Sequence, residues 1–280
     1  MKLNHFDGAS QYYKRVKDYL LRHEAHHCLL LGLVNALICV PERFTHQPYL
    51  AVVEEDDTIV TVGLRMPPNN LILSRSVNSQ ALAIVVQDLH RQQAWVPGVH
   101  GPTDEANTFA KLWQEVTGQS YRVGFAQCIY QLTTVQPIQQ ANGHLRHATQ
   151  AERDQLICWT QAFVGEALGG GDRQEAERVV DGRLKDGSLY IWQDDAPVSM
   201  ASYSGPTPNG IRVNLVYTPP EYRRQGYATS CVAALSQALL NQGRKYCFLF
   251  TDLANPTSNH IYQTIGYQPV GEATEYCFGA

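Results

Sequence analysis

The second half of the chain alternates between apolar spacing typical of strands and apolar spacing typical of helices. Strand-like runs occupy 143–148, 189–193, 198–203, 211–217, 246–251, 267–270 and 274–278. Helical spacing occupies 149–167, 172–185, 226–241 and 257–265. This pattern predicts a strand, two helices, three strands, a helix, a strand, a helix and a closing strand-like stretch. The three consecutive strands favour an antiparallel meander, and the later strand–helix–strand unit favours a parallel crossover.

Polar caps and glycines indicate where these helices begin and end. Thr149 and Glu152 have the spacing of a capping box, in which each side chain bonds to the other residue's backbone N–H. The glycines at 169–171 end the first helix, and Asp172 is placed to cap the second. Gly243 ends the third.

The first half repeats this rhythm more faintly. Helical segments are predicted at 11–21, 24–35, 79–91 and 103–117, and strands at 50–54, 59–65, 71–76 and 122–132. The turn-rich sequence at 96–102 predicts a loop, and the polar stretch at 133–144 is typical of a linker. We therefore expect an α/β (α+β) chain with two copies of one fold, in domains 1–135 and 142–280. Each would have a mixed, mainly antiparallel central sheet flanked by helices.

Composition narrows the possible functions mainly by exclusion. The 280-residue chain is 44% hydrophobic and 17% charged, which supports packed cores and argues against disorder. Its formal net charge of −4 gives no sign of a nucleic-acid-binding surface. A mild acidic excess fits an amine substrate without identifying one.

The chain also lacks the sequence features of a secreted or membrane protein. Its longest apolar run, 28–40, is shorter than the roughly 20 residues that span a bilayer, and the N-terminus has no apolar signal core. The seven cysteines form no C-x-x-C pair, and several lie in apolar runs, which is typical of buried, reduced thiols. We expect a cytoplasmic protein that binds neither membranes nor nucleic acid.

One turn between a strand and a helix has the composition of a phosphate-binding loop. The strand 211–217 leads to the sequence RRQGYA at 223–228, which opens a helix. Gly226 has no Cβ where a phosphate would approach the backbone. The first N–H groups of a helix lack partners within it, so they can donate to a diphosphate. The two arginines can add charge-assisted contacts.

These residues resemble a known family. RRQGYA is similar to the Arg-x-x-Gly-x-Ala signature with which GNAT acetyltransferases bind acyl-CoA. A second segment, NPTSNHIYQTIGY at 255–267, resembles that family's Asn-x-x-Ala-x-x-x-Tyr-x-x-x-Gly-[Phe/Tyr] pattern, with Ser258 in place of the usual alanine. The resemblance covers about 143–278, half of the chain.

The resemblance implies direct transfer of an acetyl group from acetyl-CoA, a co-substrate, to an amine of a small molecule or protein. The donor site would comprise Val216, Tyr217, Thr218, Arg223, Arg224, Gln225, Gly226, Tyr227, Ala228, Thr229, Asn255 and Ser258. The first three would pair with the pantetheine arm, the arginine–glycine loop would hold the diphosphate, and Asn255 would contact the CoA chain. Tyr262 would protonate the departing thiolate.

The general base stays open. Family members often use a glutamate or an activated water near the strand before the signature, but here that strand carries Asn214 and no carboxylate. Glu166, just before the glycine run, is the candidate that we assign as catalytic. Asp252 is a second candidate, or else a cap for the next turn.

In the first half, the turn that corresponds to the signature has no glycine and carries β-branched Val77, which would crowd a phosphate. The chain therefore resembles a tandem GNAT protein whose first domain has lost donor binding and has a structural or acceptor-site role. His23, His26 and His27 have helical spacing but no accompanying carboxylate or cysteine pattern, so we expect no metal.

Three functions remain as alternatives. The first is an N-acetyltransferase with an unknown amine acceptor. The second, suggested by the missing base, is a non-catalytic acyl-CoA-binding regulatory module. The third is an acyltransferase that acts on a thiol or hydroxyl, or that uses a longer acyl chain. A homodimer is a possible assembly.

Overall fold

The computed structural model of the chain describes residues 1–279. Contacts between residues divide it into two compact units. The first unit contains Met1–Ile129 together with the chain from Val270 on, and the second is Tyr130–Pro269. The expected domains 1–135 and 142–280 differ from these units because they assign the last strand to the second half.

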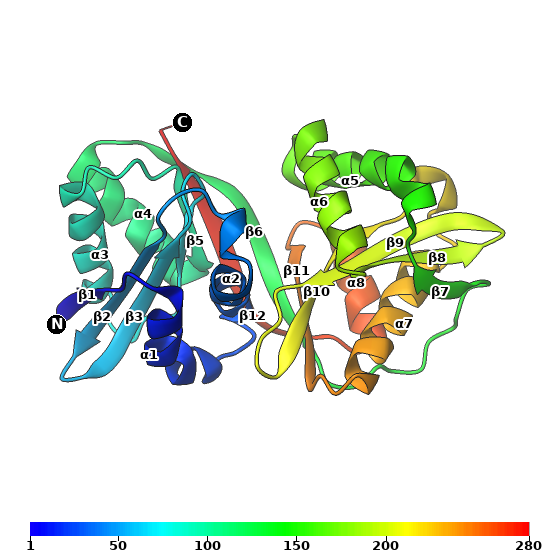
Figure 1. The fold of residues 1–280 in the computed structure, drawn as a ribbon, viewed down its shortest axis with the longest axis horizontal. Helices are drawn as coiled ribbons and strands as arrows, with labels where there is room; N and C mark the ends of the chain where they lie inside the picture. Colours follow the sequence, from blue (N-terminus) through cyan, green and yellow to red (C-terminus); the bar gives the residue numbers. More distant parts are fainter. Residues whose placement is uncertain (280) are drawn as a thin grey trace. The chain divides into compact units, whose positions relative to one another are not determined.

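The first unit begins with a strand and two helices and continues into a mixed sheet (Figure 1). Its elements are β1 (Lys2–His5), α1 (Ala9–Leu21), α2 (Cys28–Cys39), β2 (Tyr49–Glu55), β3 (Thr58–Arg65), β4 (Leu71–Leu73), α3 (Gln80–Arg91), β5 (Gly98–Pro102) and α4 (Thr103–Thr117). β6 (Tyr121–Leu132) begins in this unit and ends in the second. Strands β1 to β4 pair antiparallel in chain order, and β4 pairs with β5 in parallel. The closing strand, β12 (Gln268–Phe278), pairs antiparallel with β5.

The second unit repeats this order of elements. They are β7 (His144–His147), α5 (Arg153–Leu168), α6 (Arg173–Lys185), β8 (Leu189–Asp194), β9 (Ala196–Ser204), β10 (Gly210–Tyr217), α7 (Tyr227–Asn241), β11 (Tyr246–Asp252) and α8 (Pro256–Ile265). Strands β7 to β10 are antiparallel, and β10 pairs with β11 in parallel. The predicted tandem fold with mixed, mainly antiparallel sheets is confirmed.

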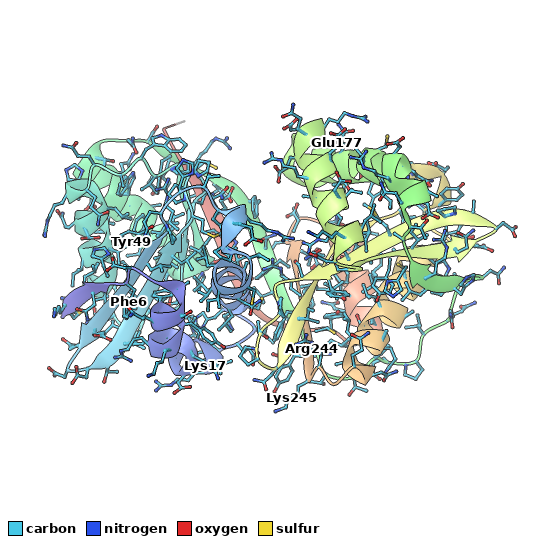
Figure 2. The ribbon with its side chains drawn as sticks, viewed as in Figure 1. Phe6, Lys17, Tyr49, Glu177, Arg244 and Lys245 are labelled. Carbon is cyan, nitrogen blue, oxygen red and sulfur yellow. The ribbon has the colours of Figure 1, made fainter. Side chains whose placement is uncertain are left out.

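Helices cover both faces of the second unit's sheet. Figure 1 shows α5 and α6 over one face and α7 and α8 over the other. Apolar residues of α5 and α6 pack with β8, β9 and β10 in one buried cluster that includes Leu156, Val180, Met200 and Leu215. Side chains fill the space between helices and sheet in each unit (Figure 2).

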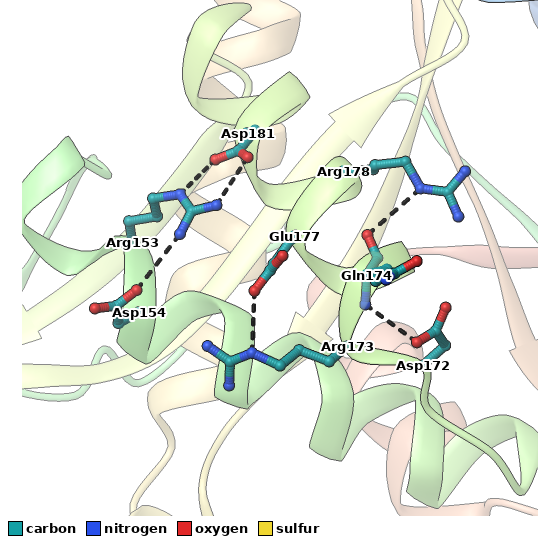
Figure 3. A network of polar contacts seen from close by, with 8 residues as sticks. All are labelled: Arg153, Asp154, Asp172, Arg173, Gln174, Glu177, Arg178 and Asp181. Atoms are coloured by element: carbon teal, nitrogen blue, oxygen red, sulfur yellow. Dashed lines mark hydrogen bonds and ion pairs between the residues drawn. The ribbon is translucent and has the colours of Figure 1, made fainter.

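The predicted caps are present where the second unit's first helices begin. The capping box forms, with the Thr149 N–H 2.7 Å from Glu152 Oε2, at a short 3-10 turn that leads into α5. Asp172 accepts the Gln174 N–H at 3.1 Å and so caps α6. An arginine of α5, Arg153, joins the two helices through both oxygens of Asp181, at 2.6 and 2.9 Å (Figure 3).

Several predicted boundaries are wrong in the first unit and at the end of the chain. The predicted helix 24–35 is displaced to Cys28–Cys39, and the predicted strand 71–76 ends at Leu73. The segment 96–102, predicted to be a loop, contains strand β5. The two closing strand-like pieces are one strand, β12, and the short polar strand β1 was not predicted because it has no apolar alternation.

The histidines near the first helix lie in the turn between α1 and α2. His27 is buried, its Nδ1 lies 2.9 Å from the Leu20 carbonyl oxygen, and its Nε2 accepts the Arg75 N–H at 3.0 Å. Burial lowers the pKa of His27 to about 4, so the ring is neutral at pH 7. Within residues 1–279, no group of three or more His, Cys, Asp or Glu residues could hold a metal ion.

All seven cysteines are free thiols. Most are buried, as expected, but Cys39 and Cys158 are exposed, contrary to that expectation. No helix within residues 1–279 has both the length and the apolar character that a membrane crossing requires.

Candidate active site

Strands β10 and β11 pair only at their beginnings. The parallel pairing joins Gly210–Arg212 to Tyr246–Phe248 and then stops. Further along β10, the register against β9 shifts between Asn214 and Tyr217, and Leu215 has a φ of 51°. A bulge of this kind bends the strand and leaves backbone groups outside the ladder. On the edge that faces β11, the end of β10 is therefore free to pair with something other than a neighbouring strand.

A cavity of about 630 Å³ lies beside this bulge. Its wall contains Glu166, Tyr262 and every residue predicted for the donor site except Gln225. Four further residues, Phe163, Tyr222, Thr257 and Ile261, line it and were not predicted. Helical spacing could have suggested Phe163 and Ile261. Phe163 lies three residues before Glu166 on α5, and Ile261 lies three residues after Ser258 on α8, so each shares a helix face with a predicted residue.

The start of α7 forms one side of the cavity. Gly226 is the N-cap and has a φ of 81°, and Arg224 before it has a φ of 64°. The first helical hydrogen bond runs from the Ser230 N–H to the Gly226 carbonyl. The N–H groups of 227–229 therefore have no helical acceptor, and the residues that carry them line the cavity. A Cβ at Gly226 would meet only the Ala141 Cβ, at 3.7 Å, so the space beside it is open.

Two residues predicted for different roles contact each other. Arg223 Nη2 lies 2.8 and 2.9 Å from the two carboxylate oxygens of Glu166, and Arg223 Nε donates to the Thr218 carbonyl at 2.9 Å. The guanidinium carbon also lies 5.7 Å from the centre of the Tyr217 ring. Both charged side chains are about half exposed, 42% and 52%, so an ion pair of this kind is worth about 1 kcal/mol or less. A bound anion could therefore displace Glu166 from Arg223.

Tyr262 lies on α8 and lines the cavity together with Thr257 and Ser258 of the same helix. Its ring packs between Tyr130 and Tyr267, with centroid distances of 6.3 and 6.0 Å. Burial raises the pKa of Tyr262 to about 12, so its hydroxyl is protonated at neutral pH. Asn255 caps α8, because its Oδ1 accepts the Ser258 N–H at 3.0 Å. Asn255 therefore has a structural contact in addition to its predicted contact with the CoA chain.

The first unit fills the corresponding place with its own side chains. Ser74 N–H donates to the Val62 carbonyl and Val77 N–H donates to the Val60 carbonyl, so the two residues between these bonds oppose one, as in the β10 bulge. Between them, the Ser76 N–H donates to Glu105 Oε1 at 2.7 Å. Glu105 is the third residue of α4, as Ser258 is of α8. The backbone donor at this bulge is thus already satisfied.

Comparison with known proteins supports the same reading of the second unit. Residues 152–267 match the family model described as Acetyltransferase (GNAT) family. No curated protein is detectably similar in sequence.

Among solved structures, a GNAT-family acetyltransferase from Colwellia psychrerythraea has a TM-score of 0.60 at 10% identity over 100% of both chains. A Drosophila protein has a TM-score of 0.69 at 12% identity, over 99% of this chain and 98% of its own. A tandem GNAT protein from the clavulanic acid biosynthesis pathway has a TM-score of 0.55 at 12% identity, over 100% and 98%. At such identities the likeness concerns the fold alone. Residues 152–267 therefore match a GNAT acetyltransferase domain, within a chain that has a tandem GNAT-like fold.

Proposed function

We propose that the second unit binds acetyl-CoA in the 630 Å³ cavity and transfers the acetyl group to an amine. One observation carries this proposal: the cavity joins the bulged end of β10, the N-terminus of α7 and the Tyr262 ring. These groups match the three parts of such a donor, namely a hydrogen-bonding arm, a diphosphate and a thioester. The open space at Gly226 fits the close approach of a phosphate.

The residues of the cavity would have the following roles in binding and catalysis. The N–H groups of 227–229 would hold the diphosphate, with Arg223 and Arg224 adding charge-assisted contacts. The backbone of 216–218 would pair with the pantetheine arm and donate to the oxyanion that develops on the carbonyl. Acetyl-CoA supplies the activated thioester, and the neutral amine attacks it directly. Tyr262 would give its proton to the departing thiolate.

The direct test is release of free thiol from acetyl-CoA in the presence of a panel of amines, with the product identified by mass. We expect a product whose acetyl group survives alkaline hydroxylamine, because amides resist it whereas thioesters and oxygen esters are cleaved. A labile product would favour the thiol or hydroxyl acyltransferase. Saturable acetyl-CoA binding without transfer to any acceptor would favour the regulatory binding module. Faster turnover with a longer acyl-CoA would show that the preferred donor is that acyl-CoA rather than acetyl-CoA.

Glu166 is proposed to accept the proton of the attacking amine once the diphosphate has drawn Arg223 away. Glu166→Gln is then expected to lower kcat about 100-fold or more, with little change in the KM for acetyl-CoA. Arg223→Gln is the matched control, since it breaks the same ion pair from the other side. That variant should raise the KM for acetyl-CoA and keep most of kcat. An unchanged kcat in Glu166→Gln would reduce Glu166 to a residue that positions Arg223.

A further inference from the structure

Arg212, on β10, has a guanidinium with no polar partner among the residues that the structure describes. Its Nη1 is buried and makes no hydrogen bond within residues 1–279, and none of the ion pairs found there includes this side chain. The guanidinium carbon lies 5.7 Å from the centre of the Phe250 ring of β11. A buried cationic donor without an acceptor is costly, so the arrangement points to an anionic ligand.

Asn214 lies on the same face of the strand, two residues further along. Strand residues alternate between faces, and Ile211 and Val213 are the buried ones on the other face. Asn214 on β10 is opposite Ser202 on β9, and Ser202 is opposite Leu189 on β8. Leu189 belongs to the buried cluster beneath α5 and α6. Residues opposite each other share a face, so Arg212 and Asn214 are directed to the side of α5 and α6.

The amide of Asn214 is held in one orientation. Its Nδ2 donates to the Ser204 Oγ at 2.6 Å, which leaves Oδ1 to accept a hydrogen bond. Asn214 is also the last residue before the bulge, and the part of this strand that lines the cavity begins at Val216. A donor group on Arg212 and an acceptor group on Asn214 thus lead along the strand to the place proposed for the thioester.

Two residues on one face of a strand are on the order of 7 Å apart. The carboxylate and the amine of an α-amino acid, with a hydrogen bond of about 2.9 Å at each end, span a similar distance. The planar guanidinium of arginine suits a carboxylate. An amide oxygen suits the N–H groups of the amine.

We infer that the amine acceptor is a free amino acid, whose carboxylate binds Arg212 and whose amine is held by Asn214 next to the thioester. This inference rests on the proposed acetyl transfer. The amine nitrogen forms the new amide bond as the carbon–sulfur bond breaks, the amine loses a proton to Glu166, and the thiolate gains one from Tyr262. The carboxylate takes no part in these steps and serves for recognition.

The test compares amino acids with the matching amino-acid amides, which keep the amine and side chain but lack the carboxylate. The full chain should acetylate the best amino acid with a kcat/KM about 10- to 100-fold above that of its amide. Arg212→Gln should abolish this preference by raising the KM for the amino acid, with kcat and the values for the amide little changed. Arg212→Lys should restore it only in part, because a lysine cannot make the bidentate contact.

Arg244→Gln is the matched control, since Arg244 is a partly exposed arginine of the same unit (Figure 2). It should leave the preference for the amino acid intact. The melting temperature of Arg212→Gln should not fall, because the variant removes a charge without a partner. A lower melting temperature together with a general loss of activity would give Arg212 a structural role and overturn the inference.

Calorimetric titration with amino acids, in the presence of CoA, separates this inference from the proposed function. Binding that is lost in Arg212→Gln, without any transfer, would support the amino-acid site while the acetyltransferase proposal fails. Equal transfer to amino acids and amides, unchanged in Arg212→Gln, would overturn the amino-acid site and leave acetyl transfer standing. The absence of both binding and transfer would overturn the inference as well.

Discussion

Replacing Gly226 with glutamate is expected to abolish the binding of acetyl-CoA. The backbone at Gly226 has a φ of 81°, a conformation that costs a residue with a Cβ roughly 1–2 kcal/mol. The larger effect is electrostatic, because a carboxylate at the N-terminus of α7 would compete with the diphosphate for the same N–H groups and repel it. Calorimetric titration of the full chain should show one saturable site per chain, and no heat of binding for the variant.

Gly243→Glu provides a closely matched control. Gly243 follows the other end of α7, has a φ of 93°, and has no atom within 4 Å of an added Cβ. The same substitution there introduces a similar backbone strain and the same charge outside the cavity. It should bind acetyl-CoA as the unchanged protein does. Equal affinity in Gly226→Glu would show that the donor binds elsewhere, for example in the first unit.

Tyr262→Phe should lower kcat at least tenfold while acetyl-CoA binding stays nearly intact. The substitution keeps the ring, and therefore its packing against Tyr130 and Tyr267, and removes only the hydroxyl. A positioned general acid contributes about 10²–10⁴-fold to a rate, so the loss should be of that order if thiolate departure limits turnover. Steady-state kinetics gives the change in kcat, and calorimetry gives the change in affinity.

Tyr130→Phe is the control for losing a hydroxyl close to Tyr262. The Tyr130 hydroxyl donates to Asn259 at 3.2 Å and accepts from Gln263 at 3.1 Å, so its removal should affect stability more than kcat. Unchanged turnover in Tyr262→Phe would remove this residue from the mechanism. A comparable fall in both variants would mean that the packing of α8, rather than one proton, matters for activity.

Most of the lining of the cavity could be predicted because its signals are local in the sequence. The loop before α7 and the segment that forms α8 are each contiguous, and their glycine and asparagine positions follow from helix capping. Gln225, within the same loop, was assigned with its neighbours but does not line the cavity. The contact between Glu166 and Arg223 could not be predicted, since it joins residues 57 positions apart on different elements.

Contacts between residues far apart in the sequence also explain why strand β5 was not predicted. Its sequence has the glycines and prolines of a turn, yet each glycine is required by a neighbour from a distant part of the first unit. A Cβ at Gly98 would lie 2.3 Å from the Tyr276 carbonyl oxygen, and one at Gly101 would lie 3.1 Å from the Leu73 Cβ. Local preferences predict a turn, whereas packing between β4 and β12 makes it a strand.

The position of β12 reverses the usual order in which two domains complete their folding during synthesis. Ala273–Cys277 pair with Gly98–Pro102, and Phe278 packs on Phe109 and Trp113, all in the first unit. A ribosome delivers these residues after the whole of Tyr130–Pro269. The sheet of the first unit therefore stays unfinished until β12 has been synthesised. By then, all residues of the second unit are already available. The second unit, although it is made later, is the one whose chain is available first in full.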